Sequence, residues 1–197
     1  MTIATAVYAA SLIPLVTILG MYFFKIIPLW ILKLYALGFL ITGFGWEIWY
    51  TYGWIDGDPV WERRPDALNA AIPYQINWIL NSLYDAFVCV SGVFWVWLAG
   101  GRTLRLFKGI NLLCLLILFI VFVGQNIYVE LGIYQGQIQE SHEMSWAPLS
   151  PKFLDTVTFF GHRMKFNTQI TWVLMVPIMY YIIKRIMPKE SEPIPDF

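Results

Sequence analysis

The chain has 197 residues, of which 58% are apolar, 18% aromatic and only 13% charged. A soluble globular domain usually carries about 25% charged and 45–50% apolar residues, so the composition excludes an ordinary water-soluble globule. Thirteen Lys and Arg balance thirteen Asp and Glu, and without a basic excess we expect no nucleic-acid partner. The length suits one membrane domain that covers residues 1–197.

Five apolar segments are long enough to cross a bilayer as helices, since about 20 residues span its hydrocarbon core. In chain order they are Ile3–Phe24, Leu29–Tyr52, Tyr74–Ala99, Ile110–Gly132 and Phe166–Ile183. The sequence therefore predicts an all-α polytopic membrane protein, a bundle of five transmembrane helices with a polar C-terminal tail over 188–197.

The basic residues are distributed unevenly between the two ends of these segments. One side receives eight of the thirteen, namely Lys25, Lys33, Arg102, Arg105, Lys108, Lys184, Arg185 and Lys189. The positive-inside rule then predicts an N-terminus outside or in the lumen and a C-terminus in the cytoplasm. Both cysteines, Cys89 and Cys114, fall inside spans, so we expect buried free thiols rather than a disulfide.

Two acidic residues stand where a membrane helix normally carries none. Glu47 lies about two turns below the outer end of the second segment, and Asp85 about three turns below the outer end of the third. A charged side chain near the centre of a span costs at least about 2.5–3.5 kcal/mol, so it normally faces a cavity or a partner. Because their depths differ by about one turn, we expect the two carboxyls to face one shared pocket.

Other polar and aromatic residues gather at similar depth, in the outer half of the predicted bundle. Asn77 and Asn81 precede Asp85 at helical spacing and form one stripe with it. We predict Glu47 and Asp85 as catalytic residues, and as substrate-binding residues Trp46, Tyr50, Asn77, Asn81, Tyr84, Gln125, Tyr128, Asn167 and Trp172. The alternative for the neutral residues is hydrogen bonding between helices, worth about 0.6–2 kcal/mol each, and Glu130 could be interfacial.

A pair of buried carboxyls can hold one proton and one negative charge, which suits general acid–base catalysis. Aromatic faces attract cations, so an acid in an aromatic pocket suits carbocation chemistry on an apolar lipid. The two histidines, His142 and His162, lie outside the spans or at their rim, and no HExxH spacing occurs. We therefore predict no metal site and no cofactor.

The pattern resembles the EXPERA family of membrane proteins, which includes the emopamil-binding sterol isomerase. Gly38–Tyr50 is similar to that family's second helix, with Glu47 at its first acid, and Ile79–Val90 to its third, with Asp85 where the isomerases carry a glutamate. The segment Val123–Tyr128 and the residues Phe166, Asn167, Trp172 and Pro177 are similar to its last two helices. The chain departs from the family at Gly43, where the isomerases have a histidine, and its Asn167-to-Trp172 spacing is two residues longer.

A second resemblance links Trp46-Glu47 and the spacing from Trp78 to Asp85 to the integral-membrane meroterpenoid cyclases, which usually have seven spans. Both resemblances imply that acids protonate a double bond while aromatic residues hold the cation. We predict an enzyme that isomerises or cyclises an isoprenoid or sterol among membrane lipids, alone or as a homodimer. Two alternatives stay open: a non-catalytic lipid-binding or sterol-binding membrane protein, and an accessory subunit of a membrane complex.

Overall fold

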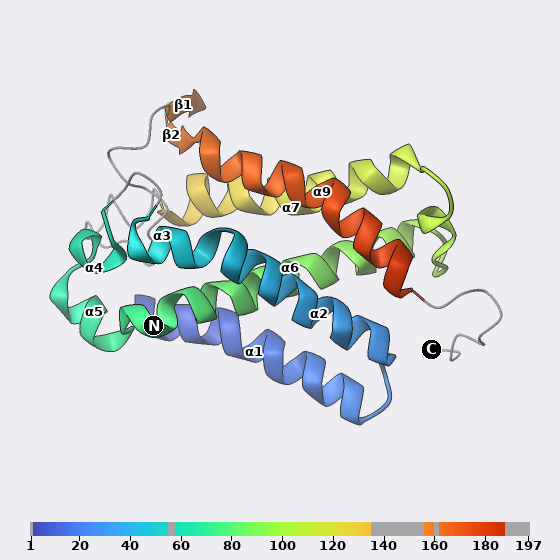
Figure 1. Ribbon diagram of the computed structural model, residues 1–197, viewed down its shortest axis with the longest axis horizontal. Coiled ribbons are helices and arrows are strands. Elements are labelled where there is room, and N and C mark those ends of the chain that lie inside the picture. Colours follow the sequence, from blue (N-terminus) through green and yellow to red (C-terminus); the bar gives the residue numbers. More distant parts are fainter. Residues whose placement is uncertain (1, 55–57, 135–155, 160–161, 188–197) are drawn as a thin grey trace.

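The structure is a computed structural model that describes residues 2–54, 58–134, 156–159 and 162–187; for Arg63, 133–134, 156–159 and 162–167 it describes the backbone alone. Long helices run side by side along one axis (Figure 1). They are α1 (Ile3–Phe23), α2 (Leu29–Thr42) with its continuation through η1 (Gly43–Glu47) and α3 (Ile48–Tyr52), α6 (Tyr74–Ala99), α7 (Leu112–Tyr128) continued by η3 (Val129–Tyr134), and α9 (Phe166–Ile186).

Short elements connect these helices. At the end that holds α3 lie α4 (Val60–Arg63) and α5 (Asp66–Ala71), and at the opposite end lies the 3-10 turn η2 (Arg105–Phe107). The strands β1 (Thr156–Phe159) and β2 (His162–Lys165) pair antiparallel and precede α9. This hairpin is an addition to the predicted all-α architecture, and the other described elements are helical.

Four helical segments are long and apolar enough to cross a membrane, namely Ile3–Phe23, Leu29–Tyr52, Tyr74–Ala99 and Leu112–Gly132. These segments match the first four predicted spans and are consistent with an integral membrane protein. The fifth predicted span forms α9, but the part of it with described side chains has the polar residues Thr168 and Gln169 at its start and Lys184 and Arg185 near its end. Those polar ends lower its mean hydropathy, so the count of five spans stays a prediction.

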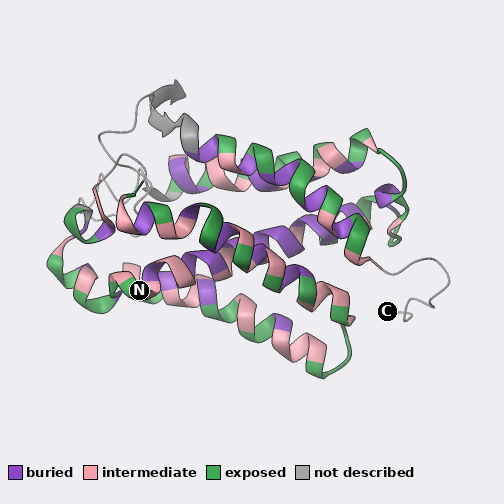
Figure 2. Cartoon of the chain, in the orientation of Figure 1, coloured by how far each residue is buried: buried purple, intermediate pink, exposed green. Residues whose placement is uncertain are grey.

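Helix α6 is the centre of the bundle and the most buried of the four candidate spans. It packs against α1, α2 and α7, while α9 covers α7 and part of α2. Figure 2 shows its buried residues along most of its length, whereas α1 buries only Val7, Ser11 and Ile18. The rest of α1 is mostly apolar and either half-buried or exposed, a surface that a bilayer would cover.

Small residues let α2 and α6 approach closely. A Cβ atom added at Gly38 would lie 3.2 Å from the Cα of Ala86 and 3.3 Å from the Cβ of Cys89. One at Gly43 would lie 3.1 Å from the Ser82 hydroxyl and 3.3 Å from the Trp78 ring. Such small-residue contacts are the usual way in which membrane helices pack without a hydrophobic driving force.

The π-helical turn η1 determines which residues the continuous helix α2–η1–α3 buries beyond Thr42. The buried positions Leu34, Gly38, Thr42, Trp46 and Tyr50 repeat every fourth residue. In a continuous α-helix each step of four would turn the buried face by about 40°. The wider π turn offsets part of that rotation, so Trp46 and Tyr50 still face α6 and the core.

A bulkier residue at Gly38 tests this packing. Gly38→Val should lower the free energy of unfolding by about 1–3 kcal/mol, because the added atoms meet the α6 backbone, which cannot move aside cheaply. The matched control is Gly20→Val in α1, where an added Cβ meets nothing within 4 Å. The measurement is the thermal unfolding midpoint of each variant in detergent, and equal midpoints for the two variants would contradict the close α2–α6 contact.

Candidate functional site

One pocket, between the η1–α3 segment, α6, α7 and the first turns of α9, gathers five of the eleven buried polar side chains in the described part of the chain. Its enclosed space is about 60 Å³, room for a few water molecules. The pocket is lined by Trp46, Glu47, Tyr50, Thr51, Asn77, Asn81, Tyr84, Asp85, Gln125, Asn126, Val129, Thr168, Thr171 and Trp172.

Three side-chain hydrogen bonds connect the η1–α3 segment to α6 along one wall of this pocket. Asn77 Nδ2 donates to Thr51 Oγ1 over 3.1 Å, and Asn81 Nδ2 donates to Glu47 Oε2 over 2.8 Å. The Trp46 indole donates to Asp85 Oδ2 over 3.2 Å. The three α6 partners are spaced four residues apart, so they lie one above the other on one helix face. We call these three pairs the polar ladder.

The polar ladder holds the two carboxyls of Glu47 and Asp85 beside each other. The two groups are close enough to repel electrostatically, and the Trp46 indole is a hydrogen-bonding neighbour of both. Asp85 is 7% exposed, whereas Glu47 is half-buried. Glu47 is therefore the carboxyl of the pair that a ligand or a water molecule reaches first.

Aromatic rings also line the pocket. Trp46 and Trp172 meet edge to face with their ring centroids 5.6 Å apart. Behind them, the Phe122 ring lies 5.9 Å from Trp172. Tyr50 and Tyr84 complete the lining near the carboxyls. Ring faces and buried carboxyls thus border the same small space, an arrangement that stabilises positive charge.

One buried acceptor in the pocket has no hydrogen-bond partner among the residues that the structure describes. Asn81 is 3% exposed, and its Oδ1 atom makes no hydrogen bond in the described part of the chain. A buried polar atom left without a partner costs about 1–3 kcal/mol. Because Asn81 lines the pocket, this oxygen is placed to accept a hydrogen bond from a water molecule or a ligand.

A third acid, Glu130, is buried next to the pocket, on the π-helical turn η3. It is 2% exposed and accepts hydrogen bonds from the Thr168 hydroxyl and, over 3.5 Å, from Asn126 Nδ2. The Tyr50 hydroxyl lies within the electrostatic reach of both Glu47 and Glu130. Glu130 is therefore buried inside the protein, which does not favour the interfacial alternative for this residue.

Asn77, a lining residue of the pocket, is held from behind by a buried arginine of the connection between the second and third long helices. Arg64 is 5% exposed and donates to Asn69 Oδ1, to Asn77 Oδ1 and to the carbonyl of Ile72 over 3.1, 2.9 and 2.7 Å. Burial lowers the pKa of its guanidinium to about 10, which leaves it positively charged at neutral pH. Through Asn77, Arg64 fixes the first rung of the polar ladder.

The structure places nearly all predicted site residues around the pocket. Both catalytic candidates, Glu47 and Asp85, line it, and so do Trp46, Tyr50, Asn77, Asn81, Tyr84, Gln125 and Trp172. Tyr128 does not line it and is 68% exposed. The backbone of Asn167 lies in the first turn of α9, and its side chain lies outside the described residues.

Several lining residues were not predicted, among them Thr51, Thr168 and Thr171. Threonine is common in apolar helices and gives no signal until its neighbours are known. Arg64 was missed because it lies in a connection, where arginine is usually solvated. Within the described residues no group of three His, Cys, Asp or Glu side chains could hold a metal ion.

Gly43 explains one departure from the isomerase pattern in steric terms. The position where those enzymes carry a histidine faces Ser82 and the Trp78 ring at contact distance. A histidine side chain here would require Trp78 to move. In this chain the position belongs to helix packing.

Comparison of the chain with protein-family models, with curated proteins and with solved structures gives no match. The resemblances to the EXPERA family and to the membrane cyclases are therefore neither supported nor contradicted by these comparisons.

Arg64 gives a test of how the connection supports the pocket. Arg64→Lys keeps the charge but cannot reproduce three hydrogen bonds from one planar group. It should therefore lower the free energy of unfolding by about 1–3 kcal/mol, the cost of leaving a buried acceptor unpaired. The measurement is thermal unfolding in detergent, with the exposed acid change Glu62→Gln as the control. Unchanged stability of the lysine variant would show that the bonds to Asn69, Asn77 and Ile72 contribute nothing.

Proposed function

We propose that this protein is an integral-membrane enzyme that isomerises or cyclises an apolar isoprenoid lipid by acid–base chemistry. The observation that carries the proposal is the pair of neighbouring carboxyls, Glu47 and Asp85, held against aromatic rings in a pocket between membrane-type helices. Helix packing alone does not call for two acids here, since neutral residues would make the same hydrogen bonds at lower cost.

The proposed reaction moves one proton onto the substrate and one proton off it. One carboxyl donates its proton to a carbon of a double bond, which leaves a carbocation on the neighbouring carbon. The other carboxylate then removes a proton from an adjacent carbon, so that the double bond re-forms in a new position or after a ring has closed. The substrate is neither oxidised nor reduced, and Trp46, Tyr50 and Trp172 would stabilise the cation through their ring faces.

The size of the pocket favours a linear substrate. Ligand pockets usually enclose about 300–1,000 Å³, whereas this one encloses about 60 Å³. A rigid sterol skeleton would need large movements of the surrounding helices. One end of a flexible isoprenoid chain needs only local movement of side chains, while the rest of the chain stays among the membrane lipids. We therefore favour a linear isoprenoid over a sterol.

The orientation of the protein in the membrane is part of the same proposal. The pocket lies in the half of the bundle near α3 and α5, away from the basic connection Arg102–Lys108. With the positive-inside rule, that half faces the outside or the lumen, as do the N-terminus and the substrate site.

Deuterium incorporation tests the proposal directly. Purified protein in nanodiscs is incubated in D₂O with linear polyprenols and, in parallel, with sterols, and the recovered lipid is analysed by mass spectrometry. Protonation from a solvent-exchanged carboxyl should add one deuterium to each product molecule. Glu47→Gln and Asp85→Asn should each lower the rate at least about 100-fold, the usual contribution of a positioned acid or base.

The control variant is Glu62→Gln, which removes an exposed acid in α4 and should leave the rate unchanged. Full activity in both Glu47→Gln and Asp85→Asn would overturn the proposed chemistry. A lipid that is retained by the protein but recovered unchanged and without deuterium would favour the non-catalytic lipid-binding alternative. If the protein neither retains nor converts a lipid, that result would favour the accessory-subunit alternative.

A further inference from the structure

The end of the bundle opposite the pocket concentrates positive charge. In the described part of the chain this end carries seven basic residues and no Asp or Glu. The seven, all exposed, are Lys25, Lys33, Arg102, Arg105, Lys108, Lys184 and Arg185. The described acids outside the pocket region, Asp58, Glu62 and Asp66, lie at the other end.

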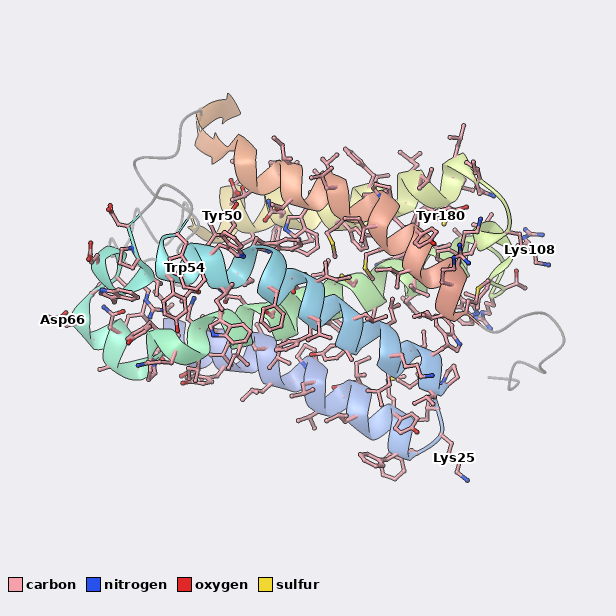
Figure 3. The ribbon with its side chains drawn as sticks, viewed as in Figure 1. Lys25, Tyr50, Trp54, Asp66, Lys108 and Tyr180 are labelled. Carbon is pink, nitrogen blue, oxygen red and sulfur yellow. The ribbon has the colours of Figure 1, made fainter. Side chains whose placement is uncertain are left out.

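Three of these cations belong to a connection that is fixed to the protein core. Leu106 and Phe107 are buried, so the short η2 turn presents Arg105 and Lys108 outward. The Tyr180 hydroxyl donates to the Gly109 carbonyl, and Lys184 Nζ donates to the same carbonyl over 2.9 Å. Figure 3 shows Tyr180 and Lys108 at this end of the bundle. The positive charges are thus held on a fixed support and not on a loose loop.

An apolar groove begins immediately next to this connection, on the surface between α6 and α7. Its volume is about 590 Å³, and it is lined by Trp95, Leu98, Ala99, Ile117, Ile120 and Val121. Ala99 is the last residue of α6, so the basic connection starts where the groove ends. Trp95 lies four residues earlier, about 6 Å along the helix axis. The groove thus runs from the basic end toward the middle of the bundle.

From this juxtaposition we infer a binding site for an anionic phospholipid. The acyl chain lies in the groove between α6 and α7, and Arg102, Arg105 and Lys108 bind the phosphate of the headgroup. Charge complementarity selects this occupant, because basic residues next to a hydrophobic groove attract anionic headgroups over zwitterionic ones. The site is separate from the pocket that holds Glu47 and Asp85 and does not depend on the proposed reaction.

Native mass spectrometry of the detergent-solubilised full-length protein tests the site. Phosphatidylglycerol and phosphatidylcholine with the same acyl chains are titrated separately, and the bound fraction gives each dissociation constant. The wild type should bind phosphatidylglycerol more tightly. A basic residue near an anionic lipid contributes about fivefold in affinity, so Arg102→Gln combined with Arg105→Gln should weaken phosphatidylglycerol binding about 25-fold.

Two matched controls separate this site from general attraction to a positive surface. Lys25→Gln combined with Lys33→Gln removes two cations from the same end but away from the groove; Figure 3 shows Lys25 far from Lys108. Phosphatidylglycerol affinity should be unchanged in that variant. Ala99→Trp fills the groove and should weaken binding of both lipids, whereas Val16→Trp, exposed on α1, which does not line the groove, should not.

Equal affinity of the wild type for the two lipids would overturn the inference. So would an equal loss in the Lys25/Lys33 and Arg102/Arg105 double variants, since the effect would then reflect charge anywhere on that surface. Unchanged binding by Ala99→Trp would show that the acyl chain does not lie in the groove.

Discussion

The structure depends on one constraint: two carboxyls inside an apolar helix bundle must be hydrogen-bonded from within the protein. The polar ladder meets that constraint for Glu47 and Asp85 with donors from Asn81 and Trp46. Each carboxyl is held by a residue of the other helix, so the ladder also sets the register between that helix and α6. Packing of Gly38 against Ala86 and of Gly43 against Ser82 brings the two helices close enough for these bonds to form.

Much of the fold was accessible from the sequence, because length and hydropathy are properties of single segments. The first four spans follow their predicted limits closely, with differences of at most a few residues. The fifth could not be decided in the same way, since α9 combines an apolar middle with polar ends. The hairpin β1–β2 was not predicted, because a short strand pair depends on pairing that periodicity does not reveal.

The composition of the site was predictable to a similar degree and for a similar reason. The spacing of Asn77, Asn81 and Asp85 places them on one face of α6 whatever surrounds that helix. The partners on other elements were harder to predict. Tyr128 is exposed although Gln125, three residues earlier, lines the pocket. Glu130 points inward from a π-helical turn, and Arg64 reaches the interior from a connection between helices. Neither position can be recognised from the local sequence.

The two π-helical turns have a consequence for comparisons between relatives. Glu47 and Glu130 each lie on one of them. A π turn arises when a helix holds one residue more than α geometry accommodates. A relative that lacks one residue between Gly43 and Glu47 would close this stretch into α geometry, and the later side chains up to Tyr52 would keep their directions but be numbered one position earlier, a step of about 100° about the helix axis. An ungapped alignment would then equate positions that point in different directions, and a shared glutamate would not establish a shared orientation.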